Sequence, residues 1–214
     1  MIGVAAVFFG GWIIKDTVFQ TRPDVQIAYV GTQELPVDTV NALQNALTPF
    51  CQDENGDGKV VVQVATYNVD FDAENESTDA YYQMAGVTRL SAELSSGGKT
   101  YIFLLEDPEG FEAQTGALQY LDGTVPDDPE TTDADWREMV YRWTDCPVLA
   151  GLDLGDYASD AVQSESGSSQ ELMSRYYIGI RGAWNKDSAD LLEGGEELWN
   201  KLTAGAVSTA SAEG

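Results

Sequence analysis

The sequence predicts an α/β fold: a three-layer domain with a mostly parallel sheet and helices on both faces, preceded by an apolar N-terminal helix. The first observation is that apolar, strand-like runs alternate with amphipathic helical patterns up to Leu105. The second is that residues 100–105 form a nearly continuous apolar run, as do strands buried on both faces. The third is size, because 214 residues with 43% hydrophobic content can enclose one sizeable core.

The first half of the chain supplies three predicted strands and two predicted helices. The strands are expected over residues 25–31, 60–64 and 100–105, and the first ends in a glycine turn. The intervening helices are predicted from apolar residues at helical spacing, namely Val40, Leu43, Leu47 and Phe50 after Pro36, and Met84, Val87, Leu90 and Leu94 before Gly97-Gly98. Strands that alternate with helices in this way favour right-handed crossover connections.

The second half of the chain is less regular. Its expected elements are, in order, a short helix over 109–118, a surface excursion over 121–135, a helix from Asp133 or Asp135 through Trp143, a mobile loop or lid over 155–170, a strand over 176–181 and a helix over 191–202. The chain after Gly205 is rich in Ser and Ala and is expected to be disordered.

The N-terminal segment 2–14 contains no charged side chain, and Lys15-Asp16 ends the run. As a helix it rises only about 20 Å, which is short of the roughly 30 Å hydrocarbon core of a bilayer. We interpret it as the outer end of a membrane-spanning helix whose beginning precedes this sequence; the alternative is an apolar first helix or strand packed on the domain. The predicted organisation is a partial transmembrane anchor (1–15), a linker (16–24), an extracytoplasmic α/β domain (25–205) and a disordered tail (206–214).

The charge of the chain limits its functions. Thirty-six acidic residues against 11 basic ones give a formal net charge of −25. Such a surface repels the phosphates of nucleic acids and attracts cations, so nucleic-acid binding is excluded. The sequence has no histidine, which removes the Ser-His-Asp and Cys-His catalysts and the His-containing zinc sites.

Residues 53–60 match the first half of a calcium-binding loop. Asp53, Asn55 and Asp57 stand at the alternate positions that supply side-chain oxygens, Gly58 stands at the sharp turn, and Lys59 offers its carbonyl. The bidentate Glu that ends a complete loop is replaced by Val64, which argues against a helix–loop–helix calcium hand. We therefore predict a structural calcium ion whose remaining oxygens come from elsewhere. The alternative is a polar turn without an ion.

The chain has two cysteines, Cys51 and Cys146. We predict a disulfide between them, which would close a long loop and contribute about 4–5 kcal/mol in the chain-entropy model. The alternative is a pair of unpaired, buried thiols in a cytosolic protein.

Ligands of open α/β sheets bind beyond the carboxyl ends of the strands. One of these ends carries the adjacent carboxylates Glu106 and Asp107, which are candidate ligand-binding residues. Neighbours on a strand point in opposite directions, so these two alone cannot straddle a glycosidic bond as acid and base. Trp136 and Trp143 are further candidates because aromatic rings stack on sugars and other flat ligands. No dinucleotide-binding or P-loop motif follows the first strand.

Three segments resemble parts of extracellular solute-binding proteins: the strand at 25–31, the run Thr-Tyr-Ile-Phe-Leu-Leu-Glu-Asp at 100–107, and Tyr-Ile-Gly-Ile-Arg-Gly at 177–182. In that family a strand followed by an acidic turn lies near the hinge between two lobes. The chain is shorter than a typical two-lobed member. It also resembles uncharacterised membrane-anchored proteins of Gram-positive clostridia, which join one N-terminal span to an acidic extracytoplasmic domain.

These observations favour a membrane-tethered, single-pass protein whose non-enzymatic domain lies outside the cell membrane. We expect the domain to bind a small solute or an envelope protein partner, with calcium and a disulfide as braces. Two alternatives stay open: a carboxylate-based glycan hydrolase, and a structural component of a cell-envelope complex.

Overall fold

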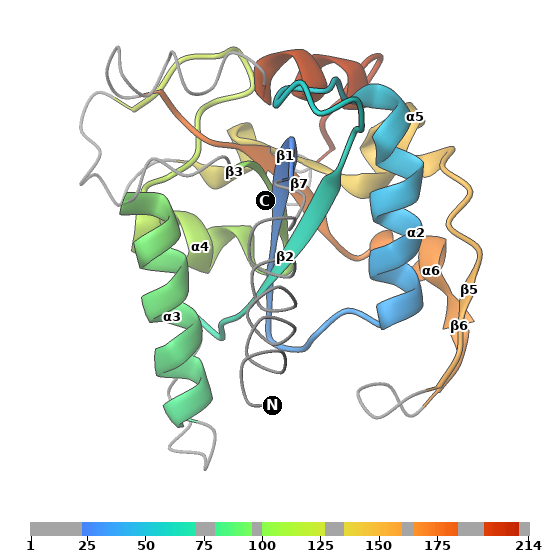
Figure 1. The fold of residues 1–214 in the computed structure, drawn as a ribbon. Helices are drawn as coiled ribbons and strands as arrows, with labels where there is room; N and C mark the ends of the chain where they lie inside the picture. The colour runs from blue at the N-terminus through green and yellow to red at the C-terminus, as the bar shows by residue number, and fades with distance from the viewer. Residues whose placement is uncertain are drawn as a thin grey trace, which may run out of the picture.

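The computed structural model describes residues 23–71, 80–95, 100–126, 135–159, 165–183 and 195–209. They form a five-stranded sheet with the strand order β2-β1-β3-β7-β4 (Figure 1). Its strands are β1 (Val25–Gly31), β2 (Val62–Asn68), β3 (Thr100–Leu105), β4 (Val140–Arg142) and β7 (Tyr177–Ile180). Strand β1 is parallel to both β2 and β3, whereas β7 is antiparallel to β3 and to β4. The predicted α/β fold with a mostly parallel sheet is confirmed.

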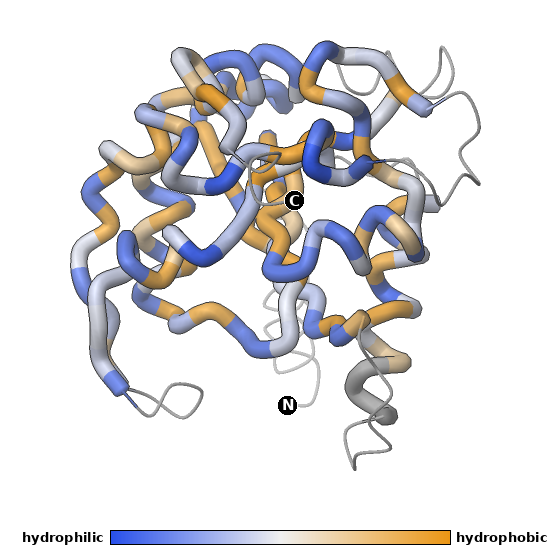
Figure 2. The backbone as a smooth tube through the Cα atoms, turned by 180° about the vertical axis from the view of Figure 1, so that it is seen from behind, coloured by the Kyte–Doolittle hydropathy of each residue, from blue (hydrophilic) through white to orange (hydrophobic). Residues whose placement is uncertain are grey.

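Successive side chains of the central strands enter two separate cores, because side chains alternate between the faces of a sheet. From β1, Ile27 and Tyr29 enter one core, while Ala28 and Val30 enter the other. All four are nearly inaccessible to solvent. This burial on both faces explains the uninterrupted apolar sequence of the central strands, which form the hydrophobic centre of the molecule (Figure 2).

Helices cover both faces of the sheet. Figure 1 shows α2 (Val37–Leu47), α5 (Pro147–Ala150) and α6 (Ser169–Met173) on one side and α3 (Ala80–Ser95) and α4 (Pro108–Thr115) on the other. A further helix at residues 195–202 contributes Leu198, Trp199 and Leu202 to the core beneath α2. The described residues also contain three single turns of 3-10 helix: η1 (Thr48–Phe50), η2 (Trp136–Glu138) and η3 (Trp143–Asp145).

The helix expected from Asp133 or Asp135 through Trp143 is wrong. Of this stretch, residues 135–143 are described, and they contain η2, strand β4 and the start of η3. Strand β4 forms because Val140 and Tyr141 pair with β7 and pack into opposite cores. Long-range pairing therefore overrides the local helical spacing of the aromatic residues.

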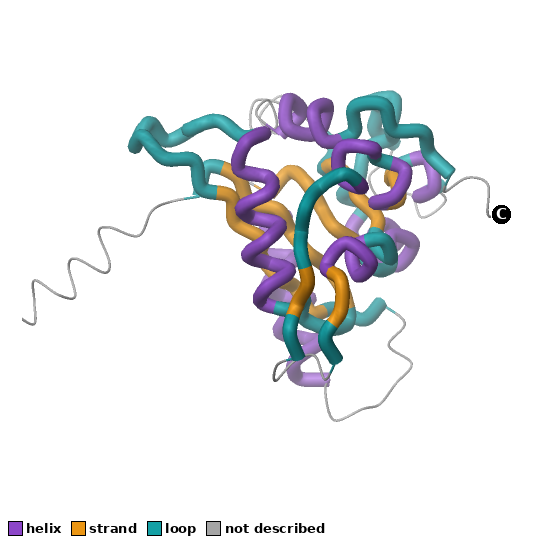
Figure 3. The backbone as a smooth tube through the Cα atoms, turned by 90° about the vertical axis from the view of Figure 1, so that its right-hand side faces the viewer, coloured by secondary structure: helices purple, strands orange, loops and turns teal. Residues whose placement is uncertain are grey.

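The segment predicted as a mobile loop or lid contains a small hairpin. Strands β5 (Asp156–Tyr157) and β6 (Gly167–Ser168) pair in antiparallel fashion, and α6 follows directly. The hydroxyl of Ser168 accepts a hydrogen bond from the N–H of Glu171, which caps α6. Figure 3 shows α2 across the face of the sheet with the hairpin beside it. Residues 160–164 lie outside the described part of the chain.

The predicted anchor at residues 1–15 also lies outside the described residues. Among the helices that the structure describes, none has the length and apolar character needed to span a membrane. At the other end, residues 206–209 belong to the expected disordered tail but are described. There the carboxylate of Asp145 accepts hydrogen bonds from the N–H and the hydroxyl of Thr209, at 2.9 and 2.7 Å.

Candidate ligand-binding site

The sheet has a topological switch point between β1 and β3. The chain leaves β1 toward α2 on one face of the sheet, and it leaves β3 toward α4 on the opposite face. Because the two connections diverge, they leave a crevice at the carboxyl ends of these neighbouring strands, where open α/β sheets bind ligands. Antiparallel strand β7 begins at the same edge, since Tyr177 pairs with Leu105 at the end of β3.

A cavity of about 340 Å³ occupies this edge. It is at the lower end of the range for small-molecule sites, which is about 300–1,000 Å³. Its charged lining consists of the carboxylates Glu34, Glu106 and Glu165 and the guanidinium of Arg175. The loop after β1 and helix α6 supply the apolar part of the wall, through Leu35 and Leu172. Acidic and hydrogen-bonding groups therefore dominate the cavity.

Two tyrosines support the inner side of the cavity. Tyr29 of β1 is 1% exposed and Tyr176, which lines the cavity, is 8% exposed. Their rings meet edge to face with centroids 5.4 Å apart, and their hydroxyl oxygens lie 3.3 Å apart. The Tyr29 hydroxyl also donates to the carbonyl of Gln33 at 2.8 Å, which fixes the loop after β1. Burial raises the pKa of both tyrosines, so both phenols are neutral at physiological pH.

Glu106 is held at the mouth of the cavity by the end of β1. Its Oε2 accepts hydrogen bonds from the N–H of Thr32 at 2.6 Å and from the Thr32 hydroxyl at 3.0 Å. Gly31 makes this approach possible, because a Cβ atom there would lie 2.4 Å from the Tyr29 hydroxyl and 2.8 Å from the Glu106 oxygen. The charge of Glu106 also contributes to the raised pKa of Tyr29 and of Tyr176, behind the larger effect of burial.

Arg175 and Tyr157 approach Tyr176 from the side of α6 and the hairpin. The Arg175 charge partly offsets the raised pKa of Tyr176, and Tyr157 adds slightly to it, so both groups lie within electrostatic reach of that hydroxyl. Within the described part of the chain, the Arg175 guanidinium forms no ion pair and the Tyr157 hydroxyl forms no hydrogen bond. The cavity thus has two hydrogen-bond donors available to a ligand.

The structure separates Glu106 from its neighbour Asp107. Glu106 lines the cavity, whereas Asp107 is the N-cap of α4 and accepts a hydrogen bond from the N–H of Gly110 at 2.9 Å. The two carboxylates cannot act on one substrate as a pair. We expected this separation, because neighbouring residues at the end of a strand point in opposite directions.

The two tryptophan candidates lie elsewhere. Trp143 is 1% exposed in the core beneath α2, and its indole N–H donates to Gln170 at 3.2 Å. Trp136 is half-buried on η2, edge-on to Tyr177 and beneath the guanidinium of Arg137. Neither tryptophan lines the cavity. A second, more open hollow of about 420 Å³ near Leu121 and Arg137 is not lined by either tryptophan.

The predicted candidate Glu106 lies at the edge of the sheet that carries the cavity, whereas Tyr29, Tyr157, Arg175 and Tyr176 were not predicted as candidates. Tyr29 lies within the strand predicted over residues 25–31, and its position there indicates a core residue and not a ligand-binding one. Arg175 directly precedes the predicted strand at 176–181 and Tyr176 begins it, but an antiparallel direction for that strand was needed to bring them to this edge. No local pattern in the sequence gives that direction.

The calcium-like loop has a well-defined hydrogen-bonded backbone. The two carboxylate oxygens of Asp53 accept from the N–H groups of Asp57 and Gly58, at 3.2 and 2.8 Å. The amide oxygen of Asn55 accepts from Asp57 at 3.0 Å, and Asp57 accepts from Lys59 at 2.9 Å. Gly58 has a φ of +82°, the left-handed conformation that the sharp turn requires. The same bonds define a polar turn, so both interpretations of the sequence share this backbone.

The donor set of this loop is incomplete as a calcium site. Asp53, Asn55 and Asp57 offer two carboxylates and one amide, and Lys59 offers its carbonyl. Nowhere in the described ranges does a group of three or more Asp, Glu, His or Cys side chains stand in a metal-binding arrangement. The residues present fit half of a calcium shell, and the calcium site stays a prediction.

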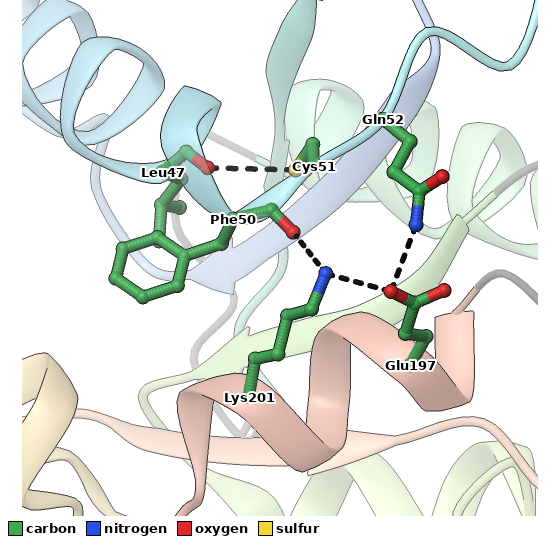
Figure 4. Close-up of polar contacts among 6 residues, drawn as sticks. All are labelled: Leu47, Phe50, Cys51, Gln52, Glu197 and Lys201. Carbon is green, nitrogen blue, oxygen red and sulfur yellow. Dashed lines mark hydrogen bonds and ion pairs between the residues drawn. The ribbon is translucent and has the colours of Figure 1, made fainter.

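Both cysteines are free thiols in the structure and belong to or pack against the core beneath α2. Burial raises the pKa of Cys51 to about 11 and that of Cys146 to about 12. Figure 4 shows the Cys51 thiol against the carbonyl of Leu47 at 3.5 Å, with Lys201 bound to the Phe50 carbonyl and to Glu197. As thiols the two groups would stay protonated and react slowly at neutral pH. The predicted disulfide stays a prediction.

Comparisons of the chain with models of known protein families, with curated proteins and with solved structures found no match.

Proposed function

We propose that this protein is a membrane-tethered, extracytoplasmic domain that binds a small polar solute carrying a cationic group, without transforming it. The observation that carries the proposal is the cavity at the switch point between β1 and β3. A volume of about 340 Å³ suits a metabolite, whereas a protein partner needs a much larger surface. For this reason we prefer a solute to an envelope protein as the ligand.

The charge of the cavity and of the whole chain supports a cationic ligand. Three carboxylates and one guanidinium line the cavity, and the chain carries a formal net charge of −25. Such a field concentrates cations near the surface and speeds their association. Thr32 donates both of its hydrogen bonds to Oε2 of Glu106, which fixes the orientation of the carboxylate. Oε1 accepts no hydrogen bond from a described residue. A preoriented acceptor of this kind costs little entropy when a cation binds.

A ligand screen tests this proposal. We expect putrescine, choline or lysine to raise the melting temperature of the domain, and acetate, succinate and glucose to leave it unchanged, because only the cations gain from the acidic cavity. Glu106→Gln should weaken the binding of the active cation at least about tenfold in calorimetry, since a charged hydrogen-bond partner is lost. The Gln side chain keeps an oxygen for Thr32, so the loop should retain its shape.

Glu109→Gln is the matched control for this screen. Glu109 is exposed on α4, close in sequence to Glu106, and does not line the cavity. Its replacement removes the same charge without removing a contact. Equal weakening by both substitutions, or a panel in which none of the cations binds, would show that the cavity is not the site.

We also propose that calcium and the Cys51–Cys146 disulfide brace the domain. Millimolar calcium should raise the melting temperature by about 5–10 °C over a chelator, as expected for an ion present at about a hundred times its dissociation constant. Asp53→Ala and Asp57→Ala should abolish this rise. Asp122→Ala, which removes an exposed carboxylate far along the chain, should not. An unchanged melting temperature with calcium would remove the ion from the proposal.

The disulfide is tested in the same samples. Thiol titration in denaturant should find no free thiol in the exported protein, and a reductant should lower the melting temperature. Two titratable thiols in exported protein would contradict the disulfide.

A further inference from the structure

We propose that the ligand of the switch-point cavity is a zwitterion of amino-acid size, whose ammonium group meets Glu106 and whose carboxylate meets Arg175. This inference rests on the proposed function and specifies the class of solute. It comes from the one feature of the cavity that a simple cation does not explain, which is the arginine in an acidic wall.

Arg175 is exposed at the start of the segment that leads into β7, and its guanidinium lines the cavity. A ligand that carries only positive charge would meet repulsion from this group. A ligand with a carboxylate would instead form charge-assisted hydrogen bonds, for which a planar guanidinium is well suited. The absence of an ion pair between Arg175 and any described residue leaves its donors available for that purpose.

The hydroxyl groups around Arg175 favour an anionic group at the same place. Tyr157 lines the cavity, and its hydroxyl makes no hydrogen bond within the described ranges. The Tyr176 hydroxyl lies between this region and Tyr29. The Tyr157 phenol can donate to a carboxylate, which accepts several hydrogen bonds at once.

Two of the three acidic groups of the cavity come from the ends of β3 and β1, and the third, Glu165, precedes β6 of the hairpin. Glu106 is fixed at the end of β3 by Thr32, and Glu34 belongs to the loop after β1. Arg175 and Tyr157 come instead from the segments around α6 and β5. Glu106 and Arg175 thus bring opposite charges to one small space from different elements of the fold, which matches an ammonium and a carboxylate carried by one small molecule.

The test compares amino acids with the amines that remain when the carboxylate is removed. The probe pairs are leucine with isoamylamine, lysine with cadaverine and arginine with agmatine, and N-acetyl-leucine is the probe without an ammonium group. We expect at least one amino acid to bind the domain at least tenfold more tightly than its paired amine, measured by calorimetry. If leucine is that amino acid, N-acetyl-leucine should bind at least tenfold more weakly than leucine. If another amino acid binds, its own N-acetyl derivative is the probe, with the same expected result.

Arg175→Gln should erase the preference for the amino acid while binding of the amine stays the same or improves. The matched control is Arg89→Gln, which removes the same charge from the exposed side of α3, on the opposite face of the sheet. An unchanged melting temperature of each variant without ligand shows that the domain is folded.

The possible results separate this inference from the proposed function. Equal binding of an amino acid and its amine overturns the zwitterion but leaves a cation-binding site. A preference that survives Arg175→Gln overturns the role of Arg175. Failure of every amine and every amino acid to bind overturns the proposed function as well.

Discussion

Asp24→Asn is expected to lower the free energy of unfolding by about 3–5 kcal/mol, because the carboxylate that it replaces is buried and accepts three backbone hydrogen bonds. Asp24 is 2% exposed at the start of β1. Its Oδ1 accepts from the N–H groups of Glu54 and Asn55 at 3.0 and 3.1 Å, and its Oδ2 accepts from Val61 at 2.7 Å. This one side chain therefore ties the first strand to both ends of the calcium-like loop.

The asparagine keeps the shape of the side chain but not its pattern of acceptors. In either orientation of the amide, its NH₂ group faces at least one backbone N–H that the carboxylate had satisfied. A buried donor left without an acceptor costs about 1–3 kcal/mol, and the loss of bonds to a charged group adds to this cost. Urea denaturation of the wild type and the variant measures the difference directly.

Asp38→Asn is the matched control for this substitution. Asp38 is exposed on α2 and accepts one backbone hydrogen bond, from Ala158 at 3.1 Å. We expect it to change the free energy of unfolding by less than about 1 kcal/mol, since water can replace the lost partner. If Asp24→Asn were as mild as Asp38→Asn, the Asp24 carboxylate would not hold the loop to the strand.

Glu112 is expected to make the protein less stable as the pH rises from about 5 to about 7, by about 2 kcal/mol. Burial raises the pKa of this carboxyl group from 4.5 to about 7, against the smaller, opposite effect of the N–H groups of Leu118 and Ala117. The residue is 5% exposed in α4, and its Oε2 accepts from Leu118 at 3.0 Å. Between these two pKa values the folded state holds a proton that the unfolded state has released. Stability from this proton is therefore complete below pH 4.5 and is lost as the pH rises through about 7.

The measurement is the difference in unfolding free energy between the wild type and Glu112→Gln at several pH values across this range. Glutamine does not titrate, so the variant should be relatively more stable at pH 7 than at pH 5 by about the amount given above. Taking the difference cancels the contribution of the other carboxylates in this acidic chain. Glu109→Gln, an exposed position on the same helix, should give a difference that does not depend on pH in this way. A flat difference for Glu112→Gln would mean that its carboxyl group is solvated.

The strands of the parallel part of the sheet were predictable because burial on both faces requires a nearly continuous run of apolar residues, which is visible in the local sequence. Residues 25–31 and 100–105 were predicted as strands with the bounds that the structure gives to β1 and β3. The second strand was predicted over 60–64, but β2 covers Val62–Asn68, because its alternation of buried and exposed residues continues to Tyr67. Helices α2 and α3 were likewise visible as stripes of apolar residues.

The candidate site was predictable only in its position. Glu106 could be placed at the carboxyl end of a strand, which is where ligands of this fold class bind. Its partners in the cavity could not be found, because Tyr29 and Tyr176 are 147 residues apart and their hydroxyl groups meet only after β7 has paired with β3. Asp24 was missed for the same reason, since it satisfies N–H groups 30 to 37 residues further along the chain.

The sequence by itself determined the α/β class, the parallel strands β1 and β3, the acidic character and the polar loop at 53–59, because each of these depends on residues close together in the chain. Only the tertiary structure decided that β7 runs antiparallel, that residues 140–142 form a strand, and that Arg175, Tyr157 and Glu106 line one cavity. These features come from contacts between distant segments. The free energy of such contacts depends on which surfaces meet. Neither a periodic pattern nor a short motif in the sequence indicates which surfaces those are.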